Sequence, residues 1–260
     1  MKKIIAIVLT TVFAVLCLCS CTANPQKSEG LNIVCTSFTE YDFVKNILGS
    51  SEGLTLLLDD GGDLHSYEPT AQDIIKIGSA DIFIHVGGVS DKWVDGVIKS
   101  ANNPKLKVVA TMDLVDTFEE EYVAGMQQEA HEHVHHEAHA GDHSEEDEHI
   151  WLSIKNAIKI SEALCKTICE TDSKNAEEYK KNTASYIEKL KTLDSEYKNT
   201  VNSARRKTVL FADRFPFRYL IEDYGLTYFA AFAGCSSESE ASFETVKRLA
   251  DFKDFQINDA

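Results

Sequence analysis

The stretch "LNIVCTS" (31–37), followed closely by "EYDFVKNILG" (40–49), sets the pattern of the fold. The first run is short and apolar, as in a buried strand, and the second carries apolar residues at helical spacing. Further strand-like runs are "LTLLL" (54–58), "ADIFIHV" (80–86) and "KVVA" (107–110), and further helix-like runs are "TAQDIIKIG" (70–78) and "DKWVDGVIKSA" (91–101). Alternating strands and helices predict parallel β/α layers with right-handed crossovers.

The second half of the chain predicts a long helix followed by a smaller β/α unit. The run "IWLSIKNAIKISEALCKTICE" (150–170) predicts a helix that opens at Ser153, and 172–207 predicts about thirty further helical residues, roughly 45 Å long. A coiled coil is the alternative, but the apolar stripe covers only about four turns, so a spine between two lobes fits better. The strands "TVLFA" (208–212) and "LTYFAAFAG" (226–234) then alternate with "FPFRYLIEDYG" (215–225) and "SFETVKRLADF" (242–252).

We therefore predict an α/β protein with two β/α lobes of parallel sheet, joined by a long rigid spine helix. Only two strands and two helices follow the spine, so we expect the second lobe to be truncated. The predicted segments are a lipoprotein signal peptide (1–20), a tether (21–30), an N-terminal lobe (31–115), an acidic His-rich loop (116–149), helices including the spine (150–205) and a partial C-terminal lobe (206–260).

The net charge of −16 argues against a nucleic-acid partner, because binding phosphates requires clustered Lys and Arg. The first twenty residues, "MKKIIAIVLTTVFAVLCLCS", have a basic start and an apolar run too short for an ordinary membrane span. "LCSC" (18–21) resembles a lipoprotein signal, so we predict lipidation at Cys21 and an extracytoplasmic, membrane-anchored protein. A cleaved signal with a coincidental cysteine is the alternative.

Four cysteines lie beyond this segment: Cys35, Cys165, Cys169 and Cys235. Their spacing matches no zinc-finger or redox motif. Cys165 and Cys169 are one helical turn apart, a geometry that bridges poorly, so we expect small core residues at both positions.

Two histidines stand where a fold of this kind would hold them rigidly. His65, in "GGDLHSYEPT" (61–70), follows a predicted buried strand and precedes a helix, and ligands in such sheets lie at the carboxyl ends of strands. His149, in "DEHIWLS" (147–153), directly precedes another helix. Two fixed imidazoles can supply half of a tetrahedral zinc site. We predict that His65 and His149 bind one metal ion.

Six more histidines lie in the low-complexity stretch before His149; they are His131, His133, His135, His136, His139 and His143. Ordering a flexible loop costs on the order of 1–2 kcal/mol per fixed residue, which weakens each loop site. We predict a low-affinity metal collector here. An enzymatic alternative treats "HEHVHH" (131–136) as a metallohydrolase signature, but the stretch has no strand end and no paired general base.

The order of these motifs resembles the zinc-binding solute-binding lipoproteins of ABC importers (cluster A-I). The resemblance covers about residues 31–254 and rests on the lipoprotein signal, "DLHSYEPTAQD" (63–73), the His-rich insert, "HIWLS" (149–153), the long spine and "FRYLIEDYGL" (217–226). It implies two lobes bridged by one helix with little hinge closure. It also implies a non-enzymatic, monomeric protein that passes Zn²⁺ to a membrane permease; manganese or iron, and a surface-adhesin role, are the alternatives.

The resemblance also implies the metal ligands, with one departure. The first and second ligands fall on His65 and His149. The third is usually a His or Glu five residues before Tyr219, where this chain has Arg214, which cannot bind a cation. We predict Asp213 as the substitute, and Cys235 as a further ligand, with Glu238 another candidate.

Overall fold

In the computed structural model, the described residues are 30–58, 62–123, 126, 146–234 and 242–258. The first part of the fold is a four-stranded parallel sheet in the order β2-β1-β3-β4. Its strands are β1 (Ile33–Cys35), β2 (Leu54–Leu56), β3 (Ile82–His85) and β4 (Lys107–Ala110). In the register, Ile33 of β1 pairs with Leu54 on one side and Ile82 on the other. The predicted parallel β/α arrangement is confirmed.

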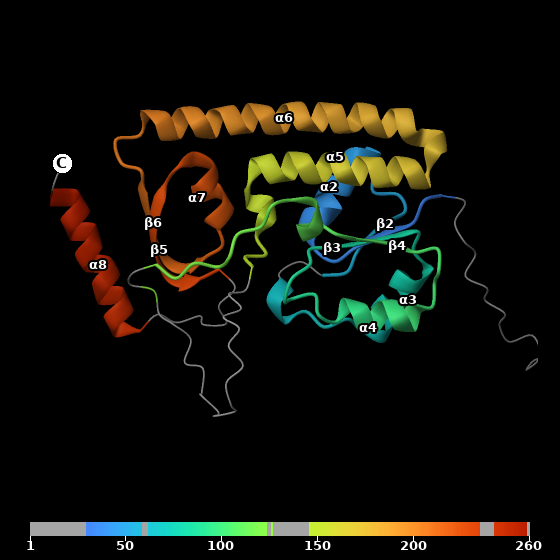
Figure 1. The fold of residues 1–260 in the computed structure, drawn as a ribbon, viewed down its shortest axis with the longest axis horizontal. Helices are drawn as coiled ribbons and strands as arrows, with labels where there is room; N and C mark the ends of the chain where they lie inside the picture. The colour runs from blue at the N-terminus through green and yellow to red at the C-terminus, as the bar shows by residue number, and fades with distance from the viewer. Residues whose placement is uncertain (1–29, 59–61, 124–125, 127–145, 235–241, 259–260) are drawn as a thin grey trace, which may run out of the picture. The chain divides into compact units, whose positions relative to one another are not determined.

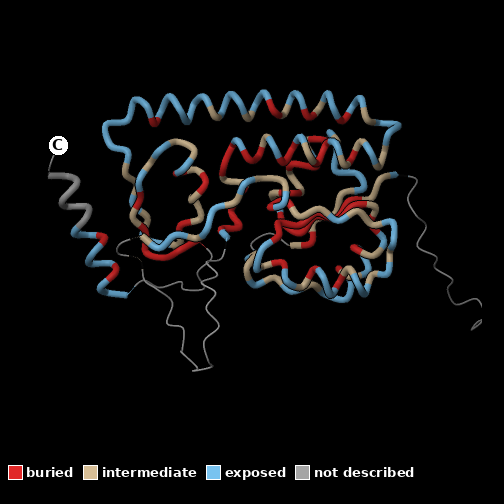
Figure 2. The backbone as a smooth tube through the Cα atoms, in the orientation of Figure 1, coloured by how far each residue is buried: buried red, intermediate tan, exposed pale blue. Residues whose placement is uncertain are grey.

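Helices cover both faces of this sheet (Figure 1). Helices α3 (Ala71–Ser79) and α4 (Val94–Ala101) lie on one face, and α2 (Phe38–Leu48) and α5 (Ile154–Thr171) on the other. Side chains alternate along each strand, so Ile33 and Ile82 enter the core beside α2 and α5, whereas Val34 and Phe83 enter the core beside α3 and α4. Buried residues concentrate in these strands and along α5 (Figure 2).

Side-chain caps fix where the helices begin. Ser37 caps α2, and Thr70 forms a reciprocal capping box with Asp73 at the start of α3. Ser153, the predicted start of α5, accepts from the Asn156 N–H and also donates a 2.6 Å hydrogen bond to Asp223 of α7. One hydroxyl therefore both starts α5 and ties it to the second lobe.

Helix α6 (Ala176–Ser203) is the predicted spine. It has 28 residues, or about 42 Å of helix. It packs along α5 and α2 and continues to α7 (Arg218–Tyr224) (Figure 1). The aromatic ring of Tyr197 stacks on Tyr224 with the ring centroids 5.4 Å apart, which joins the far end of α6 to the second lobe.

The second lobe has a two-stranded parallel sheet, β5 (Thr208–Phe215) and β6 (Thr227–Ala233). Strand β5 is longer than the predicted "TVLFA" because pairing with β6 resumes at Arg214 after a register shift. Ile221 of α7 packs on one side of the pair, and Leu249 of α8 (Phe243–Asn258) on the other. Among the described residues, no helix combines the length and apolarity needed to cross a bilayer.

The cysteine expectation is confirmed for Cys165. Cys165 is buried in the main core, and Cys169 packs against it from a half-buried position. Cys35 lies fully buried in β1. Cys235 lies outside the described residues.

Candidate metal centre

His65 lies on a short 3₁₀ helix (Leu64–Ser66) in the connection between β2 and α3. The Asp63 carboxylate starts this turn by accepting a 3.0 Å hydrogen bond from the His65 N–H. Because β2 ends just before this connection, the turn projects from the carboxyl edge of the parallel sheet. This is the place predicted from the sequence.

His149 lies directly before a second 3₁₀ helix (Ile150–Leu152), which leads into α5. Its side chain is buried against the ring of Trp151, with ring centroids 5.3 Å apart. On its other side it meets Gly234 at the end of β6, where an added Cβ would lie 3.2 Å from the imidazole. The ring is therefore held between the two lobes.

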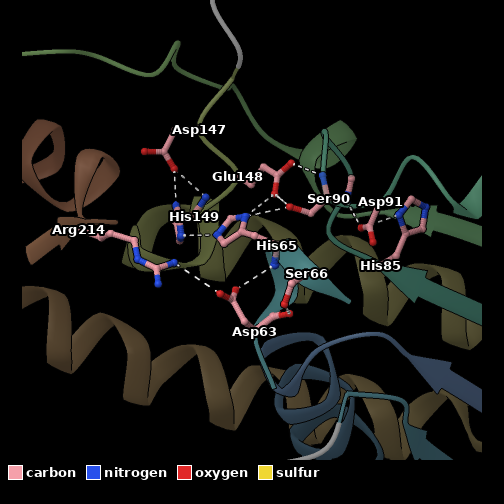
Figure 3. A network of polar contacts seen from close by, with 11 residues as sticks. Asp63, His65, Ser66, His85, Ser90, Asp91, Asp147, Glu148, His149 and Arg214 are labelled. Carbon is pink, nitrogen blue, oxygen red and sulfur yellow. Dashed lines mark hydrogen bonds and ion pairs between the residues drawn. The ribbon is translucent and has the colours of Figure 1, made fainter. Parts of the chain in front are cut away.

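The two imidazoles converge (Figure 3). Their Nε2 atoms lie 3.4 Å apart, although the residues are 84 positions apart in sequence. Two zinc–nitrogen bonds of about 2.05 Å at a tetrahedral angle place their nitrogens about 3.3 Å apart. The observed separation matches this nitrogen–nitrogen distance. The two rings therefore meet as predicted, and one ion can bind both nitrogens without a large movement.

Asp147 orients the His149 ring. Its Oδ1 atom accepts 2.8 Å hydrogen bonds from both the backbone N–H and Nδ1 of His149. A carboxylate only accepts, so the proton is assigned to Nδ1 and Nε2 carries the lone pair directed at His65. Asp147 is fully buried, which keeps water from competing for this contact.

Ser90 and Glu148 orient the His65 ring in the same way. The Ser90 hydroxyl lies 2.9 Å from His65 Nδ1 and itself donates to Glu148, so it accepts from the imidazole. The Ser90 N–H donates a 2.8 Å hydrogen bond to the other Glu148 oxygen. Nδ1 of His65 is thus the protonated nitrogen, and its Nε2 also carries the lone pair.

These contacts shift two ionisations. The hydrogen bond to Glu148 raises the pKa of His65 above its usual value, against the opposing effects of burial and of the Arg214 charge. Burial alone would raise the pKa of Glu148, but hydrogen bonds from His65 and Ser90 outweigh it, and the net pKa is lowered. Without a bound metal, each group therefore favours the charged form of the other, protonated His65 and ionised Glu148.

A second buried pair supports the loop that carries Ser90. Asp91 accepts from His85 Nδ1 at 3.0 Å and from the Gly87 N–H at 2.7 Å (Figure 3). These bonds hold the turn after β3 in place. The Nδ1 atom of His85 is therefore hydrogen-bonded to Asp91, and the His85 ring does not face the two converging imidazoles.

The structure does not place Asp213, the predicted third ligand, in a three-residue metal-binding group with His65 and His149. Asp213 is exposed on β5, and its carboxylate accepts from the Arg214 N–H at 2.7 Å. The Arg214 guanidinium lies 3.5 Å from Asp63, beside the His65 turn. Within the described ranges, no group of three or more His, Cys, Asp or Glu side chains is placed to hold a metal ion. The roles of Asp213 and of Cys235 remain predictions, and Cys235 and Glu238 lie outside the described residues.

The six loop histidines also lie outside the described residues, but both ends of their segment are held. Glu119 and Glu146 form an antiparallel bridge, and the Asp147 N–H donates a 2.8 Å hydrogen bond to the Phe118 carbonyl. The exposed insertion predicted for 116–149 therefore ends before Asp147, since Asp147, Glu148 and His149 are all buried.

Sequence reasoning missed Asp147, Glu148 and Ser90. The two acids directly precede His149, but they end an acidic run and were grouped with the solvated loop. An acidic residue two positions before a candidate ligand is a usable signal, because metal-binding histidines commonly donate their other N–H to a carboxylate. Ser90 has no local signal, since it lies 58 positions from Glu148.

The fold is therefore two parallel β/α units bridged by one long helix. Residues 33–255 match the family described as "Zinc-uptake complex component A periplasmic", and the chain belongs to this family. The chain is 33% identical over 253 residues to zinc-binding lipoprotein AdcA of Streptococcus pneumoniae (strain ATCC BAA-255 / R6), an alignment that covers 97% of this chain and 48% of that protein. It is 31% identical to the high-affinity zinc uptake system protein ZnuA of Bacillus subtilis (strain 168), covering 86% of this chain and 67% of the relative.

Solved structures agree with the fold. The Zn(II)-bound ZnuA-like domain of S. pneumoniae AdcA superposes with a TM-score of 0.68 at 28% identity, covering 87% of this chain and 75% of that one. The metal-dependent lipoprotein YcdH of B. subtilis gives a TM-score of 0.70 at 28% identity, covering 86% and 75%. The chain spans about half the length of the AdcA proteins it matches.

Proposed function

We propose that this protein captures Zn²⁺ outside the cytoplasm and delivers it to an ABC-type permease, without catalysing a reaction. The observation that carries the proposal is the 3.4 Å separation of the Nε2 atoms of His65 and His149, with each Nδ1 proton held by a partner. Two neutral imidazoles aimed at one point favour zinc over manganese, which prefers oxygen ligands. The relatives named for zinc binding and zinc uptake support the same choice.

The remaining positions around the ion are assigned to Asp213 and Cys235. Asp213 is on the strand that also carries Arg214, close to the Asp63 turn. A carboxylate and a thiolate added to two imidazoles would complete four zinc ligands. For Asp213 to reach the ion, its exposed side chain must turn away from the Arg214 N–H.

The loop histidines act as a low-affinity collector in this proposal. The bridge between Glu119 and Glu146 fixes the base of the segment, and His143 is only six residues before His149. An ion bound in the segment is therefore kept at a high effective concentration near the fixed pair. Lipidation at Cys21 would keep the whole protein beside the permease, and a Cys21→Ser chain recovered in the soluble fraction would support that anchor.

The test is zinc calorimetry on three variants and the parent chain. We expect His65→Ala and His149→Ala each to lower zinc affinity by more than the roughly 10–100-fold typical of losing an outer-shell partner. Deletion of 131–143 is the control: it removes all six loop histidines and should leave the tight site unchanged, with only weak additional sites lost. Tight binding that survives both histidine substitutions, or that vanishes with the deletion alone, would refute the assignment.

A further inference from the structure

The two cysteines of α5 lie apart from the histidine pair and play no role in it. Their Sγ atoms are 3.9 Å apart, and both thiols are free. Cys165 is buried and Cys169 is half-buried. Cys165 is eleven residues from the start of α5 at Ile154, or about 17 Å along the helix axis, so this dithiol is a separate feature.

The dithiol opens onto a hollow of about 450 Å³ between α5 and the start of α6. Besides the two cysteines, its walls carry Glu162 and Glu170 of α5, Lys166 of α5 and Lys180 of α6. Both cysteines thus line a space that is open to solvent, although Cys165 is largely buried in the core. A small ion with solvent-derived or small-molecule co-ligands fits such a space.

We propose that Cys165 and Cys169 form a second metal site, which binds a soft monovalent ion of the Cu(I) class between its two sulfur atoms. Metal–thiolate bonds of about 2.3 Å to sulfurs 3.9 Å apart enclose an angle of about 116° at the ion. That angle is close to trigonal and leaves one position open toward the hollow. Thiolate ligands select Cu(I) over the harder divalent ions.

The ligand count favours a soft ion over zinc. In the part of the chain that the structure describes, the two thiols are not joined by a third His, Cys, Asp or Glu in a metal-binding group. Structural zinc sites are almost always four-coordinate, so two sulfurs alone would hold zinc weakly. Cu(I), in contrast, is satisfied by two or three soft ligands.

Binding releases two protons, as Cu⁺ and two thiols give a bis-thiolate complex of charge −1, and no electron is transferred. The charge of Lys180 lowers the pKa of Cys169, and that of Glu177, its ion-pair partner at 2.8 Å, raises it. Burial and the neighbouring Cys165 nevertheless raise that pKa to about 11, so the uncharged thiols are stable until an ion with strong sulfur affinity displaces their protons.

The experiment uses the full chain with Cys17, Cys19, Cys21 and Cys235 changed to Ser. The remaining thiols are then the α5 pair and Cys35, which is fully buried in β1. Cu(I) is titrated under anaerobic, reducing conditions against a coloured Cu(I) chelator, and thiolate-to-copper charge-transfer absorption distinguishes sulfur binding from binding by loop histidines.

We expect one Cu(I) per chain with a charge-transfer band, and at least a tenfold loss of affinity in Cys165→Ala and in Cys169→Ala. Cys35→Ala is the matched control, because it removes one thiol outside the hollow and should leave Cu(I) binding unchanged. This background lacks Cys235, so zinc affinity is compared only among the chains that share it. Zinc affinity should not differ between the background and its Cys165→Ala, Cys169→Ala and Cys35→Ala variants, so failure of the copper site is distinguishable from failure of the zinc assignment.

Three binding results overturn the proposal. They are no Cu(I) retained by the parent chain, retention that is unaffected by either α5 substitution, and zinc binding that depends on the α5 thiols as strongly as Cu(I) binding does. X-ray absorption at the copper edge on the parent chain needs no α5 variant. It should give two sulfur scatterers, and a shell of nitrogen alone would rule the site out.

Discussion

Tyr219 of α7 donates a 2.6 Å hydrogen bond to the carbonyl oxygen of Asp147, two residues before His149. The same hydroxyl accepts a 3.2 Å hydrogen bond from the Phe118 N–H. The Tyr219 hydroxyl of the second lobe therefore bonds to the chain on both sides of the His-rich segment. It also supports the backbone from Asp147 to His149. Tyr219 is 1% exposed, so water cannot replace it.

Tyr219→Phe should lower the free energy of unfolding by about 1–3 kcal/mol, because it leaves a buried carbonyl without its donor. It should also weaken zinc binding, since the Asp147 backbone that presents His149 loses its support. Denaturant unfolding and zinc calorimetry measure the two effects. Tyr228→Phe is the control: its hydroxyl makes only a 3.5 Å contact to the Glu121 carbonyl, so a change below about 0.5 kcal/mol is expected. Equal effects of the two substitutions would contradict the special role of Tyr219.

Asp147→Ala should lower zinc affinity by about 10–100-fold, because His149 loses the carboxylate that fixes its tautomer and ring orientation. Asp147→Asn should recover part of the loss, since the amide oxygen can still accept from Nδ1. Competition with a zinc chelator gives the affinities. Asp116→Ala is the control: it removes an exposed carboxylate near the other end of the loop, paired with Lys159 at the surface, and should leave zinc affinity unchanged. A loss with Asn as large as with Ala would mean that charge, not ring orientation, is what Asp147 supplies.

Gly88→Ala should weaken zinc binding by disturbing Glu148. Gly88 has φ +75°, and a Cβ there would lie 2.5 Å from Glu148 Oε1 and 2.8 Å from its Cγ. Glu148 must then move, and Ser90 and His65 lose their partner; the left-handed backbone adds about 1 kcal/mol of strain. Gly96→Ala on α4 is the control. A Cβ at Gly96 meets nothing within 4 Å, so that helix should gain up to about 1 kcal/mol with zinc affinity unchanged.

Zinc affinity should decrease as the pH is lowered, and the decrease should begin at a pH above the usual pKa range of histidine. Zinc binds only the neutral imidazole, and the hydrogen bond to Glu148 raises the pKa of His65, so the proton competes at a higher pH than for a free histidine. Below that pKa the affinity should drop by about tenfold per pH unit for each protonated ligand. Glu148→Gln removes the charge that raises the pKa, and should move the onset of the fall to lower pH. An affinity that is constant between pH 7.5 and 5, or an onset that moves upward in Glu148→Gln, would exclude this linkage.

The sequence predicted the scaffold of the site because its signals are local. Apolar runs such as those around Ile33 and Ile82 mark buried strands wherever they occur, and Ser153 marks a helix start by its own side chain. His65 and His149 could be singled out because each borders a predicted element. That the two rings bind one ion was predicted from two rigidly held histidines in separate β/α units, and the 3.4 Å separation comes from the structure.

The rest of the site depends on contacts across long separations. Ser90 meets Glu148 across 58 positions and Tyr219 meets Asp147 across 72, and no local pattern records such pairs. Asp147 and Glu148 were missed for a different reason. Composition assigned them to the solvated loop, whereas the bridge at Glu146 folds them back into the core. The register shift before Arg214 likewise depends on how β5 pairs with β6, which β5 alone does not determine.

Glu40→Gln should make the protein more stable at neutral and alkaline pH. Glu40 of α2 is fully buried, and burial raises its pKa to about 7, although the Ser37 hydroxyl donates a 2.5 Å hydrogen bond to it. The folded protein therefore holds a proton that the unfolded chain has released above about pH 4.5, so stability falls as pH rises from about 4.5 to 7 and then levels off. Glutamine keeps an acceptor for Ser37 and carries no charge, so the variant should lack this fall, which amounts to on the order of 2–3 kcal/mol. Denaturant unfolding at pH 5 and pH 8 measures the difference, with exposed Glu52→Gln as the control. If the parent chain and Glu40→Gln lose the same stability between these two pH values, Glu40 is not the group responsible.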